Sequence, residues 1–303
     1  MSELRWHPLL REWVTLAPWR QDRTYHPAAS DCPLCPTRPG RPETEIPESD
    51  YHIAVFENRF PSYTGDQGRC EVVCYTADHD SSLGAQPAAH IRDLIEVWQD
   101  RHDELSALSG VKYVHIFENR GEEIGVTLSH PHGQIYAYPF VPARIERETE
   151  SSLLHYEAEG TCLYCDVLAG EWEGDRMVVE NERWLAFVPE FARWPYEVHL
   201  APREHVGTIS ELSSGQSDGF AHILKALLQK YDALFGKPLA YVMSMHQRPS
   251  DAAGHYHFHV EFYPPNRSAD KLKMLAGSEL GAGAYILDAR PEETAKQLRE
   301  VGA

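Results

Sequence analysis

The sequence has few positive charges, no long hydrophobic run and only six cysteines. It contains 28 lysines and arginines against 46 aspartates and glutamates, a formal net charge of -18 at pH 7. A general nucleic-acid-binding role would instead require a basic surface. No segment approaches the ~20 consecutive apolar residues that span a bilayer, and residues 1–10 contain no apolar core typical of a signal peptide. We therefore expect a cytoplasmic protein that binds neither nucleic acid nor membrane.

The 303 residues, 42% of them hydrophobic, are enough for a sizeable core. This length predicts two domains, or one large domain built from two halves. Four of the cysteines form two C-x-x-C pairs, Cys32/Cys35 and Cys162/Cys165. In a reducing compartment such pairs bind metal or perform redox chemistry more often than they form structural disulfides. The other two, Cys70 and Cys74, lie in a strand-like stretch, where we expect buried thiols.

The segment His130-Pro131-His132-Gly133-Gln134 places two histidines around a rigid proline. Proline fixes its own φ and favours an extended residue before it, so both imidazoles project from a stiff backbone. Gly133 lets a ligand approach the main chain, and Gln134 supplies an amide that can donate to an oxyanion. A neutral imidazole beside such donors can attack phosphorus and carry the transferred group as a covalent intermediate. The alternative is a coincidence in a chain with 17 histidines.

The two halves of the chain repeat one order of motifs. These motifs are Cys32/Cys35, His79, His130/His132 and Tyr138-Pro139 in the first half, and Cys162/Cys165, His205, His255/His257/His259 and Tyr263-Pro264 in the second. The spacing from the second cysteine to the isolated histidine is 44 and 40 residues, and from there to the histidine-rich segment 51 and 50. Apolar residues recur at helical spacing over residues 88–108 and 216–235. We therefore predict an α+β fold of two halves, 1–150 and 151–303, each with an antiparallel sheet and a crossing helix. The charged residues 144–150, where the halves join, are typical of an exposed helix.

Each C-x-x-C pair, together with two distant histidines, fits a closed tetrahedral zinc site of two cysteines and two histidines. The predicted ligands are Cys32, Cys35, His79 and His130 in the first half and, by the repeat, Cys162, Cys165, His205 and His255 in the second. The first metal would be structural and would hold the loop that carries His132. A redox pair or spare thiols are the alternatives. Residues 255–261 alternate histidine, histidine, histidine and glutamate, so a strand there would place all four on one face.

Together these motifs resemble the galactose-1-phosphate uridylyltransferase family of the histidine-triad-like superfamily. The resemblance covers most of the chain and rests on residues 13–23, Phe56-Glu-Asn58-Arg-Phe60, Phe117-Glu-Asn119-Arg, His130-Pro-His-Gly-Gln134, residues 184–197, Phe262-Tyr-Pro-Pro265 and residues 267–279. It implies a duplicated histidine-triad-like fold and a homodimer whose active site lies at the subunit interface. The implied activity is a ping-pong exchange between UDP-glucose and galactose 1-phosphate through a uridylyl-histidine, giving glucose 1-phosphate and UDP-galactose.

The resemblance also implies roles for individual residues. They are a nucleophile, His132; a donor to the phosphoryl oxygens, Gln134; phosphate contacts, Arg20 and Arg23; residues near the uridine and α-phosphate, Asn58 and Asn119; and contacts to the sugar and its phosphate, Lys273 and Glu279. Charge-assisted contacts from arginine or lysine suit a sugar phosphate. Without the resemblance, the arginines could be solvated charges and the asparagines turn caps, and the last two residues could be exposed charges.

The chain departs from the family pattern at a further metal site. Some members hold iron with one glutamate and three histidines, and the matching positions here are Glu148, His246, His259 and Glu261, so one histidine is replaced. Those members also lack the second C-x-x-C pair. We therefore expect zinc in the second half, with iron as the alternative.

Three other functions remain open from the sequence. An adenylyltransferase or ADP-sugar phosphorylase on the same scaffold would share the His-Pro-His loop, although Gly133 favours the uridylyl branch, because related adenylyl enzymes often have serine there. A nucleotide-binding module that is stabilised by zinc and has no catalytic activity would tolerate the loss of His132. A histidine-triad hydrolase would differ by admitting water to the intermediate.

Overall fold

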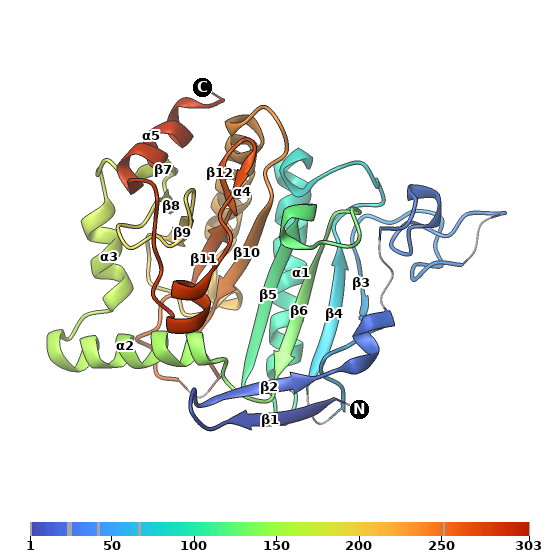
Figure 1. Cartoon of the computed structure of the whole chain (residues 1–303), viewed down its shortest axis with the longest axis horizontal. Coiled ribbons are helices and arrows are strands. Elements are labelled where there is room, and N and C mark those ends of the chain that lie inside the picture. The colour runs from blue at the N-terminus through green and yellow to red at the C-terminus, as the bar shows by residue number, and fades with distance from the viewer. Residues whose placement is uncertain (1, 23–25, 41–42, 66–67, 251, 303) are drawn as a thin grey trace.

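The centre of the computed structural model is a nine-stranded sheet with the order β3-β4-β6-β5-β10-β11-β9-β8-β7. Each neighbouring pair of strands is antiparallel. Helices α1 (Ala88–Ser106) and α4 (Ser214–Leu234) lie behind one face, and the β1–β2 hairpin and the C-terminal segment lie in front (Figure 1). The structure describes residues 2–22, 26–40, 43–65, 68–250 and 252–302.

The strands of the central sheet are β3 (Ala54–Glu57), β4 (Arg69–Cys74), β5 (Tyr113–Arg120), β6 (His132–Tyr138), β7 (Met177–Glu180), β8 (Trp184–Phe187), β9 (Val198–Pro202), β10 (Tyr241–His246) and β11 (His259–Tyr263). Two further strand pairs are β1 (Glu3–His7) with β2 (Glu12–Leu16), and β12 (Asn266–Ser268) with β13 (Lys271–Leu272). The remaining helices are α2 (Ala143–Glu159), α3 (Leu163–Glu171) and α5 (Pro291–Glu300). Short helical turns are η1 (Pro18–Asp22), η2 (Ala29–Asp31), η4 (Leu83–Ala85), η5 (Glu122–Ile124), η6 (Ile209–Glu211) and η7 (Gly277–Gly281).

The strands from the two halves of the sequence form one continuous sheet. The junction is the antiparallel pairing of β5 with β10, in which Asn119 lies opposite Val242. The division of the chain into 1–150 and 151–303 remains a prediction.

Local sequence signals explain where the long helices begin and end. Ser213 and Gln216 form a capping box at the start of α4, in which each side chain accepts a hydrogen bond from the other residue's backbone N–H. Helix α2 ends at Gly160, whose φ of 74° is in the left-handed region that glycine adopts without strain. These local signals define where α4 begins and where α2 ends.

The main core lies between the sheet and the pair α1 and α4. The rings of Trp184 on β8 and Phe220 on α4 stack with centroids 4.5 Å apart, and both side chains are fully buried. The indole N–H of Trp184 donates to the carbonyl of Gln216 at 2.7 Å, so the ring is buried without losing its hydrogen bond. This packing fixes the sheet on which the histidines are carried.

The predicted α+β class, with antiparallel strands and packed helices, is confirmed. The helices predicted at 88–108 and 216–235 appear as α1 and α4, and the charged residues 144–150 lie in α2. Cys70 and Cys74 are buried thiols of β4, as expected. The strand predicted from residue 255 is wrong at its start, because β11 begins at His259. Within the described ranges, no helix is long and apolar enough to cross a membrane.

Candidate active site and metal centres

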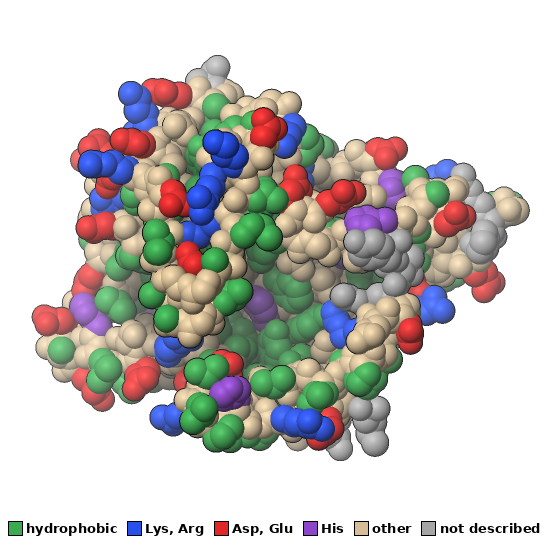
Figure 2. Space-filling model, in the orientation of Figure 1, with side chains coloured by type: hydrophobic (Ala, Val, Ile, Leu, Met, Phe, Trp, Pro, Cys, Tyr) green, Lys and Arg blue, Asp and Glu red, His purple; other side chains and the backbone are tan. Residues whose placement is uncertain are grey.

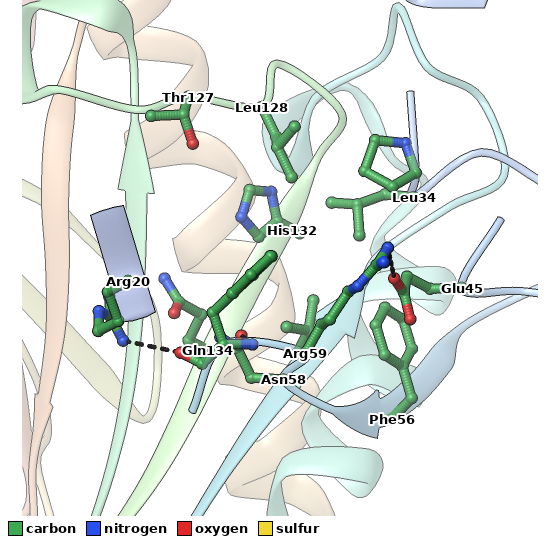
Figure 3. Close-up of a pocket in the computed structure, with 13 residues that line it drawn as sticks. Arg20, Leu34, Glu45, Phe56, Asn58, Arg59, Thr127, Leu128, His132 and Gln134 are labelled. Atoms are coloured by element: carbon green, nitrogen blue, oxygen red, sulfur yellow. Dashed lines mark hydrogen bonds and ion pairs between the residues drawn. The ribbon is translucent and has the colours of Figure 1, made fainter. Parts of the chain in front are cut away.

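His132 is the first residue of β6 and its ring lies at the wall of a cavity of about 120 Å³ (Figure 3). Its Nδ1 donates to the backbone carbonyl of His130 at 2.8 Å, which leaves the lone pair on Nε2. Burial lowers the pKa of His132, against the opposing effect of that hydrogen bond. The ring is therefore neutral at pH 7, with one nitrogen available as a nucleophile.

Residue 133 must be glycine because a neighbouring side chain leaves no room for a Cβ. A Cβ at this position would lie 2.2 Å from the hydroxyl oxygen of Tyr75, which is itself fully buried. The motif alone predicts that this glycine admits a ligand to the main chain. Instead, the structure places the Tyr75 ring against β6 at this position.

A chain of hydrogen bonds orients Gln134 beside His132. Because side chains alternate along β6, His132, Gln134 and Tyr136 lie on one face of the sheet. The Tyr136 hydroxyl donates to Oε1 of Gln134 at 3.3 Å and accepts from Arg20 at 3.0 Å. The same Arg20 nitrogen donates to the Ser62 hydroxyl at 2.6 Å. Since the amide oxygen of Gln134 is engaged by Tyr136, its NH₂ group is the end that can donate to a ligand.

The cavity beside His132 changes in character from one side to the other. Figure 3 shows Arg20 and Gln134 on one side of His132, and Glu45 and Arg59 on the other. Its lining also includes the apolar side chains of Leu34, Phe56, Val72 and Leu128. On this side of the molecule a hollow lies over the middle of the sheet, with hydrophobic and histidine side chains in it (Figure 2). The cavity suits an elongated ligand with a charged end and an apolar middle.

The two predicted asparagines lie on different sides of His132. Asn58 lines the cavity with His132, and its Oδ1 also accepts from the backbone N–H of Phe60 at 2.9 Å, so it caps a turn as well. Asn119 lies near the end of β5 and lines a second cavity of about 350 Å³, which His132 also borders. Arg23 lies outside the described residues.

Lys273 and Glu279 are close to each other but do not line either cavity. Their charged atoms are 3.9 Å apart, and Lys273 Nζ donates to the carbonyl of Ile286. The Lys273 side chain is almost completely buried. Within one chain, these two residues form a separate group in the C-terminal segment.

The structure brings together Cys32, Cys35, His79 and His130, whose ligand atoms all lie within 4.8 Å of one another. The Cys35 sulfur is 3.3 Å from Nδ1 of His79 and 3.5 Å from Nδ1 of His130. Two ligands on one tetrahedral zinc would have sulfur and nitrogen about 3.5 Å apart. The opposite nitrogen of His130 donates to the carbonyl of Thr76, the outer contact typical of a metal-bound histidine. These residues fit a zinc ion.

A second group repeats this arrangement with one correction. It contains Cys162, Cys165, His205 and His257. The Cys165 sulfur lies 3.6 Å from Nδ1 of His205 and 3.3 Å from Nδ1 of His257, and the opposite nitrogens face the carbonyls of Gly254 and Pro202. The prediction of His255 as the fourth ligand is wrong. The His255 ring instead stacks with Tyr156, with centroids 6.1 Å apart.

A third group, largely buried, contains no thiol. Its ligand atoms come from Glu148, His246 and His259, and from His199, His259 and Glu261. Glu148 accepts from His246 at 2.8 Å and from Tyr256 at 2.7 Å, while Glu261 accepts from Arg193 at 3.1 Å and from Tyr263. Although burial alone would raise it, the pKa of Glu261 is lowered well below its usual range by the charges of His246 and His199. Oxygen and nitrogen donors of this kind fit iron or zinc.

Two residues of these sites are absent from the set predicted by the sequence motifs. Thr127 lines the cavity beside His132, five residues before it, and no pattern in the sequence distinguishes it. His257 could have been found by aligning His132 with His259. Each donates from Nδ1 to the carbonyl of the residue two positions earlier, at 2.8 and 3.0 Å, so His257 is the counterpart of His130.

Known proteins are similar to this chain over nearly its whole length. Family models for the N- and C-terminal domains of galactose-1-phosphate uridyl transferase match residues 62–142 and 146–303. The galactose-1-phosphate uridylyltransferase of Thermotoga maritima is 44% identical over 99% of this chain and 98% of its own length, and that of Streptomyces lividans 41% over 99% and 87%. A solved uridylyltransferase structure, 33% identical, covers 99% of this chain and 98% of its own with a TM-score of 0.89. The chain therefore belongs to the galactose-1-phosphate uridylyltransferase family.

Proposed function

We propose that this protein exchanges UMP between UDP-glucose and galactose 1-phosphate through a covalent uridylyl-His132. The observation that carries the proposal is the fixed tautomer of His132, whose Nε2 borders a cavity shared with Gln134 and Arg20. Membership of the uridylyltransferase family supports UMP as the transferred group and these two sugar phosphates as substrates.

In the first step, Nε2 of His132 attacks the α-phosphorus of UDP-glucose. The N–P bond forms, the bond from the α-phosphorus to the bridging oxygen breaks, and glucose 1-phosphate leaves with the electron pair. In the second step, a phosphate oxygen of galactose 1-phosphate attacks the same phosphorus and the N–P bond breaks, which restores neutral His132 and gives UDP-galactose. The His130 carbonyl holds the Nδ1 proton throughout.

Stabilising charge on the phosphoryl oxygens is the main contribution that such a transfer requires from the protein. The NH₂ group of Gln134 is oriented towards this task by Tyr136, and Arg20 supplies positive charge on the same side of the cavity. Asn58, Asn119 and Arg23 are assigned to the nucleotide and phosphate by the family resemblance.

The proposed assembly is a homodimer in which Lys273 and Glu279 contact the hexose phosphate in the partner's cavity. The role of these two residues rests on the family resemblance, and their placement in the partner's cavity is supported by the fact that the pair lines neither cavity beside His132 in its own chain. Lys273 would provide the charge-assisted contact to the sugar phosphate.

Zinc is the metal proposed for both cysteine-containing groups. The sulfur–nitrogen distances and the outer contacts of the histidines support this, and each zinc would be structural because four protein ligands close the site. The third group, centred on His259 and Glu261, would hold iron or zinc through nitrogen and oxygen alone. None of the six cysteines forms a disulfide, which supports a reducing compartment such as the cytoplasm.

The test is intact-protein mass spectrometry after mixing the protein with UDP-glucose alone, under a mildly alkaline quench. We expect one added UMP per chain, which disappears when galactose 1-phosphate is added while UDP-galactose appears. His132→Ala should form no adduct, whereas His52→Ala, on the exposed surface, should label like the wild type. An adduct from ADP-glucose but not from UDP-glucose would establish the adenylyl alternative, and no adduct from either would contradict the enzymatic proposal.

A further inference from the structure

Arg59 and Glu45 form an ion pair on the side of the cavity away from Arg20 and Gln134 (Figure 3). The guanidinium of Arg59 donates to the Glu45 carboxylate at 3.3 Å, and its side chain is 69% exposed against 26% for Glu45. Neither residue touches the phosphoryl-binding group described above. The pair is therefore available to a different part of the same ligand.

The side chains that line the cavity between its two charged sides indicate which part of the ligand the ion pair contacts. Leu34, Phe56 and Val72 contribute apolar surface, and Phe60 lies under the Arg59 guanidinium at 5.8 Å. Flat apolar walls with polar groups at one edge are the arrangement that binds an aromatic ring and reads its hydrogen-bonding edge. With the α-phosphorus at His132, the nucleobase is the aromatic part of the substrate that reaches beyond the phosphate.

The segment that carries Glu45 is fixed to the first cysteine pair. The Glu45 backbone N–H donates to the carbonyl of Pro33 at 3.0 Å, and Ile46 bridges to Pro36 in a parallel pairing. Ile46 and Leu34 are buried in one small cluster with Cys32. The Glu45 carboxylate is thus positioned by the same loop whose cysteines face His79 and His130.

We propose that Glu45 and Arg59 form the base-selecting edge of the nucleotide site and distinguish uracil from cytosine. Glu45 accepts the N3–H of uracil, and Arg59 donates to an adjacent carbonyl oxygen. Cytosine presents a lone pair at N3, which a carboxylate repels, so Glu45 excludes it. Five guanidinium protons and two carboxylate oxygens allow both contacts while the pair itself persists. This inference rests on the proposed uridylyl transfer.

The experiment compares UDP-glucose with CDP-glucose as donors, through the rate of adduct formation followed by intact mass. Glu45→Gln should reduce the preference for UDP-glucose by roughly tenfold, because an amide can donate to N3 of cytosine as well as accept from N3 of uracil. Arg59→Gln should slow labelling by UDP-glucose by about tenfold, since it removes a charge-assisted donor. The matched control is Arg5→Gln, because Arg5 forms a similarly exposed pair with Glu3 on β1; it should change neither quantity.

Exchanging the two charges provides a second measurement. The double variant Glu45→Arg, Arg59→Glu places a donor towards N3, so we expect its preference to shift towards CDP-glucose. An unchanged ratio of the two donors in Glu45→Gln and in the double variant would overturn the inference. An equal decrease in the rate of adduct formation with UDP-glucose and CDP-glucose would also overturn the inference. Glu45 would then bind the ribose, which the two donors share.

The outcomes separate this inference from the proposed function. If wild-type protein forms no adduct with UDP-glucose, the uridylyl transfer itself is contradicted. If the wild type labels normally and the variants keep its donor ratio, the transfer stands and only the base-selecting role fails.

Discussion

His132 and His130 are joined by a hydrogen bond from Nδ1 of the first to the backbone carbonyl of the second, 2.8 Å long. Because Nδ1 of His130 faces the Cys35 sulfur, the carbonyl that fixes the tautomer of His132 belongs to a residue of the first candidate metal group. In the second half, His259 and His257 repeat the bond at 3.0 Å, but Nε2 of His259 lies 3.3 Å from the carboxylate of Glu261. In His259, the counterpart of His132, the second ring nitrogen is thus already paired with a carboxylate of the same strand.

The labelling rate of His132 should be insensitive to pH down to its ordinary pKa of 6.5 and fall only below it. Burial lowers the pKa of this histidine, so its Nε2 stays unprotonated in mildly acidic solution. Quenched-flow labelling with UDP-glucose would give the rate at each pH, with circular dichroism as a control for folding. A decline that begins above pH 6.5 would contradict the neutral, buried ring.

Gln134→Ala should reduce the labelling rate by roughly 100-fold, the cost typical of losing one donor to a developing oxyanion. Tyr136→Phe should reduce it by only about tenfold, because it removes the hydrogen bond that orients the amide and leaves the amide in place. Both variants should act on kcat more than on KM. If the labelling rate fell as much in Tyr136→Phe as in Gln134→Ala, the Tyr136 hydroxyl would have to contact the substrate itself.

His257→Ala should lose one zinc per chain, whereas His255→Ala should retain it. The two histidines are two residues apart and both are buried, but of the two only His257 faces the Cys165 sulfur. Elemental analysis of the purified variants gives the zinc content, and thermal unfolding should show a lower Tm for His257→Ala. Equal zinc content in the two variants would contradict the assignment of His257.

Gly133→Ala should be destabilised by about 1–3 kcal/mol, the cost typical of overpacking, because its methyl group would meet the Tyr75 hydroxyl. Tyr75→Phe should be close to neutral, since this hydroxyl has no hydrogen-bond partner in the described part of the chain. Urea unfolding of both variants and of the double variant completes a cycle. Strictly additive effects would show that the hydroxyl is not what excludes a side chain at residue 133.

Glu118→Gln should change how stability depends on pH. Burial raises the pKa of Glu118 to about 7, against the opposing effects of Arg120 and the Tyr241 hydroxyl, compared with 4.5 in the unfolded chain. The folded protein therefore keeps a proton that the unfolded chain has lost, and this residue lowers wild-type stability progressively as pH rises from 4.5 to 7. The difference in free energy of unfolding between variant and wild type should grow by about 3 kcal/mol over that range. Urea titrations at several pH values give the free energy of unfolding of both proteins. A difference between them that does not change with pH would contradict this prediction.

Much of the candidate site could be predicted because its residues are close in sequence or repeat at similar spacing. His130, His132 and Gln134 lie within one strand and its approach, where local geometry decides their positions. The misassigned ligand shows the limit of spacing, since His255 and His257 lie 50 and 52 residues after His205, each one residue away from the 51 that separate His79 from His130. The strand period fixes the correct choice, because the ligand lies two residues before the histidine that begins β11.

Contacts between segments that are distant in sequence could not be predicted in this way. Glu45 and Arg59 line the cavity beside His132 because the cysteine-bearing loop packs against β4 through Cys32, Leu34 and Ile46. The role of Gly133 likewise depends on Tyr75, from the loop after β4, so no local rule distinguishes a glycine that admits a ligand from one that admits a tyrosine ring.

The pairing of β5 with β10 has a consequence for any attempt to express the halves separately. Each half would present a full-length strand with unsatisfied backbone donors and acceptors, Tyr113–Arg120 on one side and Tyr241–His246 on the other. Such open edges recruit strands from other molecules, so isolated halves should aggregate, whereas co-expressed halves could recombine by restoring the shared ladder. We therefore expect the two predicted halves to depend on each other to fold.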